Sequence, residues 1–145
     1  MLSQRARYAL KALLNLARHD AGMNQVRALS EEENIPRRFL EVIMADMRKA
    51  GLVESTRGKT GGYRLARPAS LITFAEIIRI TDGAIALVPC VSRNFYAKCD
   101  DCVDERTCEI RQVMSLLRTQ MSAVLDYTTL ADAVAGTAPA VLRAG

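Results

Sequence analysis

The sequence has few aromatic residues, a single histidine and no cysteine outside residues 90–108. Aromatic residues make up 5% of the 145 residues, whereas hydrophobic residues of all kinds make up 50%. A chain of this length and apolar content can bury the core of about one domain, and aliphatic helices are expected to dominate that core. The one histidine, His19, lies near the end of the first expected helix and far from any serine motif. We therefore expect a surface or capping histidine and no Ser-His-Asp catalytic site.

Long apolar runs and export signals are also missing. No run approaches the roughly 18 apolar residues that a membrane-spanning helix needs. The N-terminus begins with charged residues and lacks the continuous apolar core and cleavage site of a signal peptide. We therefore expect a cytoplasmic protein that does not associate with membranes and whose thiols are kept reduced.

The basic charge is concentrated in the first half of the chain. Residues 1–68 carry 13 lysine and arginine residues against 7 aspartate and glutamate residues, whereas residues 69–145 carry 7 against 9. A basic surface attracts the phosphates of nucleic acids, although solvated helices of other proteins carry similar charges. The first half is therefore the candidate nucleic-acid-binding region.

Apolar periodicity and turn residues predict three helices in this basic half. Apolar side chains recur on one face over residues 3–20, and a short second helix is expected over about residues 25–34. Pro36 is expected to start a third helix, because the first helical residue has no intrahelical N–H bond to lose. This helix is expected to run to about Ala50, before Gly51. Its apolar stripe consists of Phe39, Leu40, Ile43, Met44 and Met47.

A short basic hairpin is predicted next. Residues 52–56 and 63–65 have the composition of strands, and the glycine-rich segment between them carries Arg57 and Lys59. Two helices joined by a short turn and followed by such a hairpin form a winged helix-turn-helix. In that architecture the second helix of the pair enters the major groove, and cations of the wing reach phosphates or the minor groove.

The hairpin tip is not expected to bind a nucleotide. Gly58-Lys59-Thr60 resembles the end of a P-loop, which has the pattern G-x-x-x-x-G-K followed by a helix. This chain has Val53 at the position of the first glycine, and a turn and strand are expected after Thr60. The spacing therefore rejects the P-loop interpretation.

Four cysteines, Cys90, Cys99, Cys102 and Cys108, form the most unusual feature of the chain. Residues 84–105 show no convincing periodicity and are expected to form a loop. A loop of this length is uncommon in a compact domain unless it is functional or held by cross-links. Thiolates suit zinc, copper(I) and iron–sulfur clusters, and disulfides are rare in the cytosol. The segment is therefore predicted to form a metal centre.

A long amphipathic helix is predicted over about residues 107–125, with Cys108 in its first turn, after a shorter helix over about residues 74–80 that Thr73 caps. The apolar stripe of the long helix consists of Ile110, Val113, Met114, Leu117, Met121, Val124 and Leu125. Such a stripe is typical of a helix that packs against another helix, and a two-fold dimer matches a palindromic operator. We expect a homodimer through this helix, although packing within the chain would produce the same pattern.

These elements predict a mainly α protein with a small β-hairpin, in which a winged helix-turn-helix is followed by a long C-terminal dimerisation helix. The expected division is a DNA-binding domain over residues 1–83, a cysteine-rich sensor loop over residues 84–106, and the dimerisation helix and tail over residues 107–145. Thr129 is expected to cap a short last helix to about Ala135.

Several motifs match one known family in the right order. They are Arg7-Tyr8-Ala9-Leu10, residues 35–41, Gly51-Leu52-Val53, Arg57-Gly58, Gly61-Gly62-Tyr63, the acidic-apolar helix near Glu76 and the cysteine loop before a long helix. Over nearly its whole length the chain resembles the IscR/NsrR/RirA family of bacterial repressors. The resemblance implies a dimeric, cytoplasmic winged-helix regulator of transcription, whose iron–sulfur cluster reports iron, redox or nitric-oxide status.

The resemblance also implies the residues that contact double-stranded DNA. By similarity, Arg38, Phe39, Glu41 and Val42 lie at the groove-facing start of the recognition helix, and Arg57 lies in the wing. The cations Arg37 and Lys59 complete the candidate DNA-binding set. Glu41 is interpreted as a base-selective residue, because a carboxylate accepts from the amino group of cytosine and repels phosphate; a solvated surface acid is its plainer interpretation.

The cysteine pattern departs from the family in one respect. Family members commonly have three cysteines, and the interval between Cys102 and Cys108 preserves their last spacing. The further ligand of the family is a histidine or an acidic residue, at positions that correspond here to Arg111 and Arg7. Neither arginine is a plausible ligand, so Cys99 is assigned as the fourth ligand.

Alternatives to a 2Fe-2S or 4Fe-4S cluster stay open at this point. Four thiolates also fit tetrahedral zinc, which would give a zinc-stabilised DNA-binding module. A thiol–disulfide switch needs no metal, and Cys99-x2-Cys102 is compatible with a thiol oxidoreductase, although no thioredoxin-like alternation of strands and helices surrounds it. The signal, the operator, the target genes and the sign of regulation are not written in the sequence.

Overall fold

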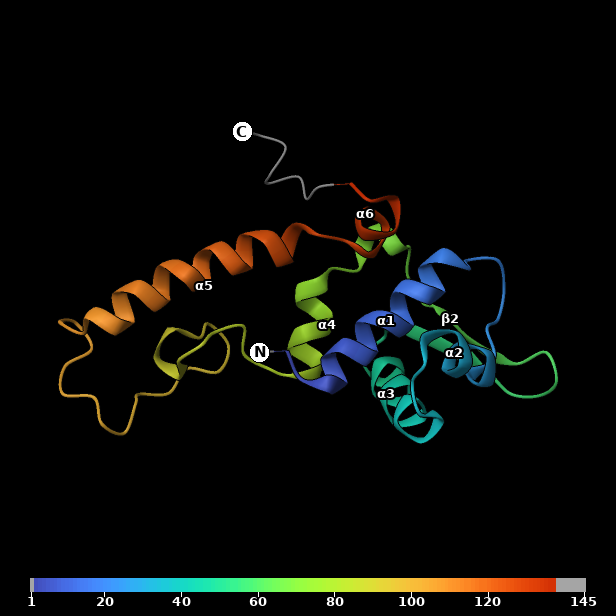
Figure 1. Ribbon diagram of the computed structural model, residues 1–145, viewed down its shortest axis with the longest axis horizontal. Coiled ribbons are helices and arrows are strands. Elements are labelled where there is room, and N and C mark those ends of the chain that lie inside the picture. The colour runs from blue at the N-terminus through green and yellow to red at the C-terminus, as the bar shows by residue number, and fades with distance from the viewer. Residues whose placement is uncertain (1, 138–145) are drawn as a thin grey trace.

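The computed structural model describes residues 2–137 as a mainly helical protein with one hairpin (Figure 1). Its fold class is the predicted one. The elements in chain order are α1 (Gln4–Arg18), α2 (Val26–Glu33), α3 (Arg37–Lys49), β1 (Val53–Thr56), β2 (Gly62–Leu65), the 3-10 turn η1 (Ala69–Leu71), α4 (Phe74–Thr81), the 3-10 turn η2 (Pro89–Val91), α5 (Glu109–Tyr127) and α6 (Leu130–Ala135).

Helix α1 forms the centre of the hydrophobic core. The Oγ of Ser3 accepts a hydrogen bond from the N–H of Ala6 at 3.0 Å and caps the helix. Leu13 and Leu16 are buried, and α1 lies against α3, α4 and α6. Burying each such side chain contributes about 1.5–3 kcal/mol. The other large, fully buried side chains are Leu29, Ile35, Leu40, Met44, Met47, Leu52, Ile72, Ile77 and Leu130.

The ends of the first three helices follow from capping residues. His19 is the C-terminal cap of α1, and its Nδ1 lies 3.0 Å from the carbonyl oxygen of Asn15, so the predicted capping role is confirmed. Asn34 ends α2 in the left-handed conformation with a φ of 52°. Pro36 is the N-cap of α3 and not its first helical residue, because its ψ of 126° is not helical. Gly51, with a φ of 77°, follows α3 as predicted.

Phe39 corrects the predicted apolar stripe of α3. Leu40, Ile43, Met44 and Met47 are buried as expected. Phe39 instead lies 63% exposed, because the inward face of α3 starts at Leu40 and Phe39 faces away from it. An exposed aromatic ring on this helix is compatible with the groove-facing position that the family resemblance implies.

The wing is an antiparallel pair of strands in which Val53 lies opposite Leu65 and Thr56 opposite Gly62. The pair is tied to the loop before α2 by two backbone hydrogen bonds of 2.8 Å between Asn24 and Tyr63. The backbone of Asn24 therefore approaches Gly62 so closely that a Cβ at Gly62 would overlap it. This contact fixes the root of the wing.

A second backbone bridge joins α4 to the end of α5. Thr73 pairs with Thr129, the N–H of Phe74 donates to the carbonyl of Thr128, and the N–H of Leu130 donates to the carbonyl of Ile72, both at 2.9 Å. Thr129 forms a capping box at the start of α6, as predicted. Figure 1 shows α5 extending from this bridge away from the other helices, toward the cysteine segment.

Helix α5 begins two residues later than predicted, at Glu109, and ends two residues later, at Tyr127. Cys108 is the N-cap and lies outside the first turn, because its ψ of 111° is not helical. Its Sγ accepts the hydrogen bond that a capping side chain normally accepts, from the N–H of Arg111 at 3.4 Å. No helix among residues 2–137 is long and apolar enough to cross a bilayer.

We predict that Gly62→Ala destabilises the protein more than Gly58→Ala. Both glycines have positive φ, 147° and 106°, where alanine is strained by about 1–3 kcal/mol. Only at Gly62 would the added Cβ also overlap backbone, whereas the space around Gly58 is open. Urea unfolding followed by circular dichroism measures both free energies of unfolding, and equal losses would contradict a wing root held by close backbone contact.

Candidate functional site

A basic cleft of about 430 Å³ lies between α2, α3 and the wing. Four arginines line it, Arg27 from α2, Arg37 and Arg48 from α3, and Arg57 from the wing. No carboxylate lines the cleft within the described part of the chain. Arginine side chains present several N–H donors in a fork that fits phosphate, so the cleft is suited to a nucleic-acid backbone.

Two side-chain hydrogen bonds hold the wing against the helices. Nη1 of Arg48 donates to Oγ of Ser55 at 3.1 Å, and Nε2 of Gln25 donates to the backbone carbonyl of Lys59 at 2.9 Å. The wing therefore has a defined position relative to α3, and the cations of both elements lie on one surface.

The structure brings together some of the predicted DNA-binding residues. Arg37 and Arg57 line the basic cleft, whereas the other candidates are exposed outside its lining: Arg38, Phe39, Glu41 and Val42 on α3 and Lys59 in the wing. The carboxylate of Glu41 is not isolated, because Nε of Arg37 donates to it at 2.9 Å across one helical turn.

Arg27 and Arg48 were missed as candidate site residues. Arg27 lies on α2, to which the sequence analysis assigns no DNA contact, and Arg48 lies near the end of α3, away from its groove-facing start. The sequence signal that could have identified Arg48 is its position as a cation at the end of α3, shortly before the glycine-rich wing. Its contact with Ser55 depends on tertiary structure and was not visible in the sequence.

The four cysteines line one pocket of about 420 Å³ at the start of α5. Cys90 lies in η2, Cys108 caps α5, and Cys99 and Cys102 lie in a turn in which the N–H of Cys102 donates to the carbonyl of Cys99 at 3.1 Å. All four are free thiols. The segment from η2 to α5 thus brings all four cysteines to the lining of one pocket.

Neighbouring groups perturb two of these thiols. A hydrogen bond with Cys90 raises the pKa of Cys99, and partial burial adds to the effect. Partial burial also raises the pKa of Cys102, and the positive charge of Lys98 acts against it. Both thiols are therefore less ionised in the metal-free protein than ordinary cysteines, so binding of a cation must displace their protons.

The donor set fits a thiolate-ligated cluster, although the sulfur atoms are not arranged in advance. Within residues 2–137 no three cysteine, histidine or carboxylate side chains are grouped closely enough to hold a metal ion. The pocket nevertheless holds four thiols, and Arg111 lines it with a buried Nε that has no hydrogen-bond partner. An unpaired buried cation beside four sulfur atoms suits a negatively charged group, such as a cluster with four thiolates.

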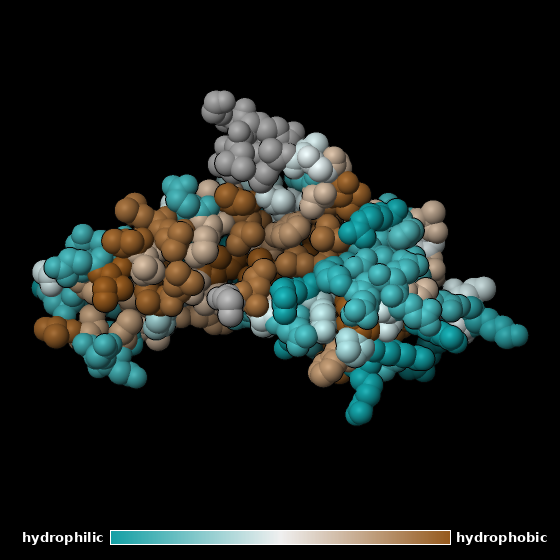
Figure 2. Space-filling model, in the orientation of Figure 1, coloured by the Kyte–Doolittle hydropathy of each residue, from teal (hydrophilic) through white to brown (hydrophobic). Residues whose placement is uncertain are grey.

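The predicted apolar stripe of α5 is exposed in its first half, at Ile110, Val113 and Leu117, and its other positions are half-buried. Ile110 is 65% exposed and Val113 is 58% exposed, and Ser122 is the one residue of α5 that is buried. Figure 2 shows hydrophobic residues gathered over α5 and the segment beside it, whereas the N-terminal half is mainly hydrophilic on this face. Contiguous exposed apolar surface of this kind marks an interaction site.

Comparison with known proteins agrees with this architecture. The model of the Rrf2 family, described as an iron-dependent transcriptional regulator, matches residues 2–136. An rrf2-like HTH-type transcriptional regulator of Rhodobacter capsulatus is 43% identical over 145 residues, which cover 97% of this chain and 96% of that protein. The HTH-type transcriptional regulator CymR of Bacillus subtilis is 32% identical over 132 residues, which cover 90% of this chain and 87% of that protein.

Solved structures have the same fold. The global cysteine regulator CymR of B. subtilis superposes with a TM-score of 0.77 at 30% identity, covering 94% of this chain and 98% of that one. IscR of T. potens superposes with a TM-score of 0.71 at 31% identity, covering 94% of this chain and 87% of that one. The family consists of regulators of transcription and not of enzymes. The winged helix-turn-helix, the long α5 and these matches show that the chain belongs to the Rrf2 family of HTH-type transcriptional regulators.

Proposed function

We propose that this regulator is a cytoplasmic repressor that binds a palindromic operator as a homodimer, and that an iron–sulfur cluster held by Cys90, Cys99, Cys102 and Cys108 controls its binding. The proposal divides the chain into a DNA-binding domain (1–83), a sensor loop (84–106) and a dimerisation helix with its tail (107–145), of which residues 138–145 lie outside the described residues. The observation that carries the proposal is the convergence of all four thiols on one pocket at the start of α5.

The DNA-binding surface combines the basic cleft with the exposed face of α3. Arg48 and Arg57 would bind phosphates in the cleft without a competing carboxylate, whereas Arg27 and Arg37 would do so while paired with Glu31 and Glu41 on their own helices. Arg38, Phe39 and Val42 would face the bases from α3, and Lys59 would reach the backbone from the wing tip. Glu41 would read a base while Arg37 holds its carboxylate in one position.

Dimerisation would cover the apolar stripe of α5. Two such helices packed around a two-fold axis would place one α3 on each side of it, so that the pair enters successive major grooves roughly 34 Å apart. The spacing of the two α3 helices therefore depends on the direction in which α5 leaves its own subunit.

The cysteines are placed to control that direction. An iron–sulfur cluster supplies a redox-active centre whose potential depends on its ligands, its charge and nearby hydrogen bonds. Coordination by Cys90, Cys99 and Cys102 together with Cys108 would tie the sensor loop to the N-cap of α5, and Arg111 would balance the charge of the thiolates. Release of the thiolates would free the loop and change the fit of the dimer to its operator.

A thiol–disulfide switch is the second candidate, and one observation favours it. Cys90 is the main cause of the raised pKa of Cys99, so these two thiols are neighbours and form the candidate pair for a disulfide. Disulfide formation would remove two protons and two electrons from the pair, which an external oxidant such as a peroxide would take up. A zinc site with the same four ligands is the other alternative.

Metal analysis separates these three possibilities. We expect protein purified without oxygen to be coloured and to contain iron and acid-labile sulfide, and each of the four Cys→Ser variants to lose both. Asp100→Asn, a change in the same loop outside the lining of the thiol pocket, is the control and should keep both. Protein that contains zinc and no sulfide would show a structural zinc site in place of the cluster. Protein without metal would leave the disulfide switch as the remaining candidate.

Arg57→Ala and Glu41→Ala are predicted to affect DNA binding differently. Arg57→Ala should weaken binding to every duplex and lower the slope of log K against log salt by about 1, because one phosphate contact is lost. Glu41→Ala should keep the slope and relax selectivity at one base position by about 1–3 kcal/mol. Fluorescence anisotropy on duplexes selected from a random pool measures both effects.

Two control variants accompany this comparison. Arg106→Ala removes an exposed cation remote from the cleft and should leave DNA affinity unchanged. Glu31→Ala breaks the ion pair with Arg27, which has the same helical spacing as the pair of Glu41 with Arg37, and should leave base preference unchanged. Equal loss on all duplexes for Glu41→Ala would disprove its role in base selection.

Cys90→Ala is predicted to make Cys99 more reactive in the metal-free protein. The hydrogen bond with Cys90 is the main cause of the raised pKa of Cys99, so its loss should increase the thiolate fraction near pH 8. Cys102 serves as an internal control, because partial burial is the main cause of its shift. Rates of iodoacetamide alkylation, resolved by peptide mass spectrometry, should rise at Cys99 alone; an unchanged rate there would exclude the Cys90 contact.

A further inference from the structure

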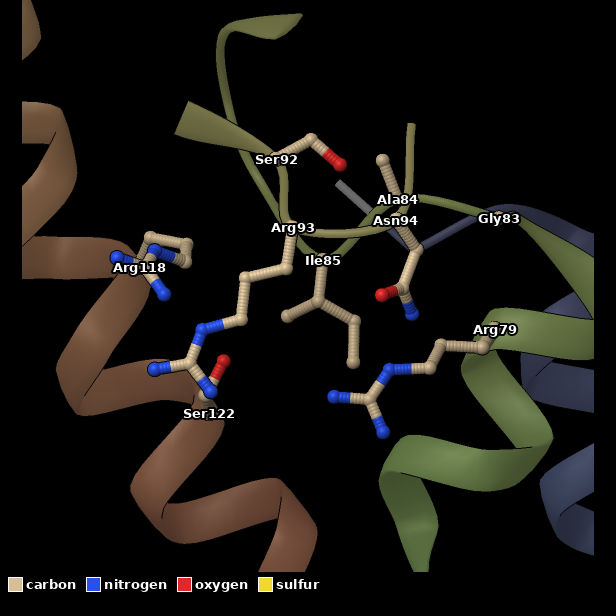
Figure 3. A pocket seen from close by; sticks show the side chains of 9 residues that line it. All are labelled: Arg79, Gly83, Ala84, Ile85, Ser92, Arg93, Asn94, Arg118 and Ser122. Carbon is tan, nitrogen blue, oxygen red and sulfur yellow. The ribbon is translucent and has the colours of Figure 1, made fainter. Parts of the chain in front are cut away.

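A second cationic cavity lies between α4, α5 and the segment after η2. It shares no lining residue with the basic cleft. It has a volume of about 30 Å³. Figure 3 shows Arg79 reaching into it from α4 and Arg93 from the segment after η2, with Arg118 and Ser122 on α5 beside them. The remaining lining residues are Gly83, Ala84, Ile85, Ser92 and Asn94.

The cavity contains more positive charge than its protein neighbours balance. Nη1 of Arg79 contacts Oδ1 of Asp126 at 2.7 Å. No ion pair or side-chain hydrogen bond of Arg93 or Arg118 is present within residues 2–137. Nε and Nη1 of Arg118 are both buried without a partner. Of the three guanidinium groups only that of Arg79 has a carboxylate partner, so the charges of Arg93 and Arg118 are not balanced by an ion pair within the described residues.

Buried N–H donors of a charged group are costly unless something accepts their hydrogen bonds. Two uncharged hydroxyl groups that line the cavity can also donate hydrogen bonds to an anion. Ser92 already accepts a hydrogen bond from the N–H of Phe95 at 3.0 Å, so its own O–H is available to donate. Ser122 is buried and adds a second hydroxyl.

We propose that this cavity binds one small, doubly charged oxyanion of the phosphate or sulfate class. Two uncompensated positive charges match a dianion, and forked guanidinium groups match the geometry of tetrahedral oxyanions. The small volume excludes a nucleotide, whose base and sugar need a far larger pocket. The site is independent of the proposed metal centre, because no cysteine lines it.

The bound oxyanion would connect three parts of the chain. Arg79 belongs to α4 of the winged half, Arg118 belongs to α5, and Arg93 follows Cys90 closely in the sensor loop. One anion that accepts from all three would fix the sensor loop and α5 against α4. Its concentration would thereby act on the orientation of α5, the same variable that the cysteines are proposed to control.

Isothermal titration calorimetry of the full chain with sodium phosphate and, separately, sodium sulfate tests the site at constant ionic strength set with sodium chloride. We expect one oxyanion per chain and a rise in melting temperature that chloride does not reproduce. Arg118→Gln and Arg93→Gln should each weaken binding about tenfold or more, since each removes charge-assisted hydrogen bonds. Binding of phosphate alone would assign phosphate, and equal binding of both would assign the shared tetrahedral dianion.

Two further variants make the test selective. Arg106→Gln removes an exposed cation outside the cavity and should leave oxyanion affinity unchanged. Arg57→Gln probes the basic cleft, so loss of binding in this variant but not in Arg118→Gln would move the anion to the DNA-binding surface and overturn the proposal. A changed dimer dissociation constant in Arg118→Gln with unchanged oxyanion binding would also overturn it, because a partner's carboxylate would then satisfy Arg118. Arg93 is exposed, so Arg93→Gln keeps the test decisive if Arg118→Gln fails to fold.

Discussion

The backbone bridge between Thr73 and Thr129 is the constraint on which the arrangement of the two halves depends. Hydrogen bonds on both sides of it fasten the end of α5 and the start of α6 to α4, and Leu130 is fully buried in the core around α1. The other end of α5 lies 19 residues away, or roughly 28 Å at the helical rise, and has no comparable support. Helix α5 is thus fixed at one end, and the position of its other end depends on the contacts of the cysteine segment around Cys108.

The N-terminal end of α5 can be held in place by charged groups but not by apolar packing. Between α4 and α5 the only buried apolar side chains of the described residues are Val91 and the thiol-bearing Cys90, which cannot form a core of their own. Two cavities lie between this segment and α5, and each has an arginine of α5 with unsatisfied N–H donors. Arg111 lies beside the thiols, and Arg118 lies beside Arg93. Under the two proposals, such a segment would gain order when anionic groups occupy those spaces, as a sensor requires.

Local signals predicted most of the fold, because caps and periodicity act within a few residues. Thr73, Thr129 and Gly51 mark element ends where the sequence placed them. Phe39 was assigned to the wrong face because helical periodicity alone does not show where a buried stripe begins. Of the sites, the cysteines were found because they are rare and close in sequence. The two cationic sites needed the structure, because Arg27 and Arg48, or Arg79, Arg93 and Arg118, come together only through tertiary packing.

The ion pair between Arg37 and Glu41 shows how the DNA-binding surface can combine attraction with selectivity. Both side chains are about half exposed or more, so the pair contributes little to stability. The ion pair holds the carboxylate of Glu41 in place one turn from the start of α3. The negative charge of that carboxylate also reduces the attraction of Arg37 for phosphate. Arg48 and Arg57 have no such acidic partner in the described structure, so in the proposed complex they would supply the unselective attraction. Sequence preference would then depend on the carboxylate of Glu41 finding a donor on a base, since a mismatched base would leave that charge facing DNA phosphates without compensation.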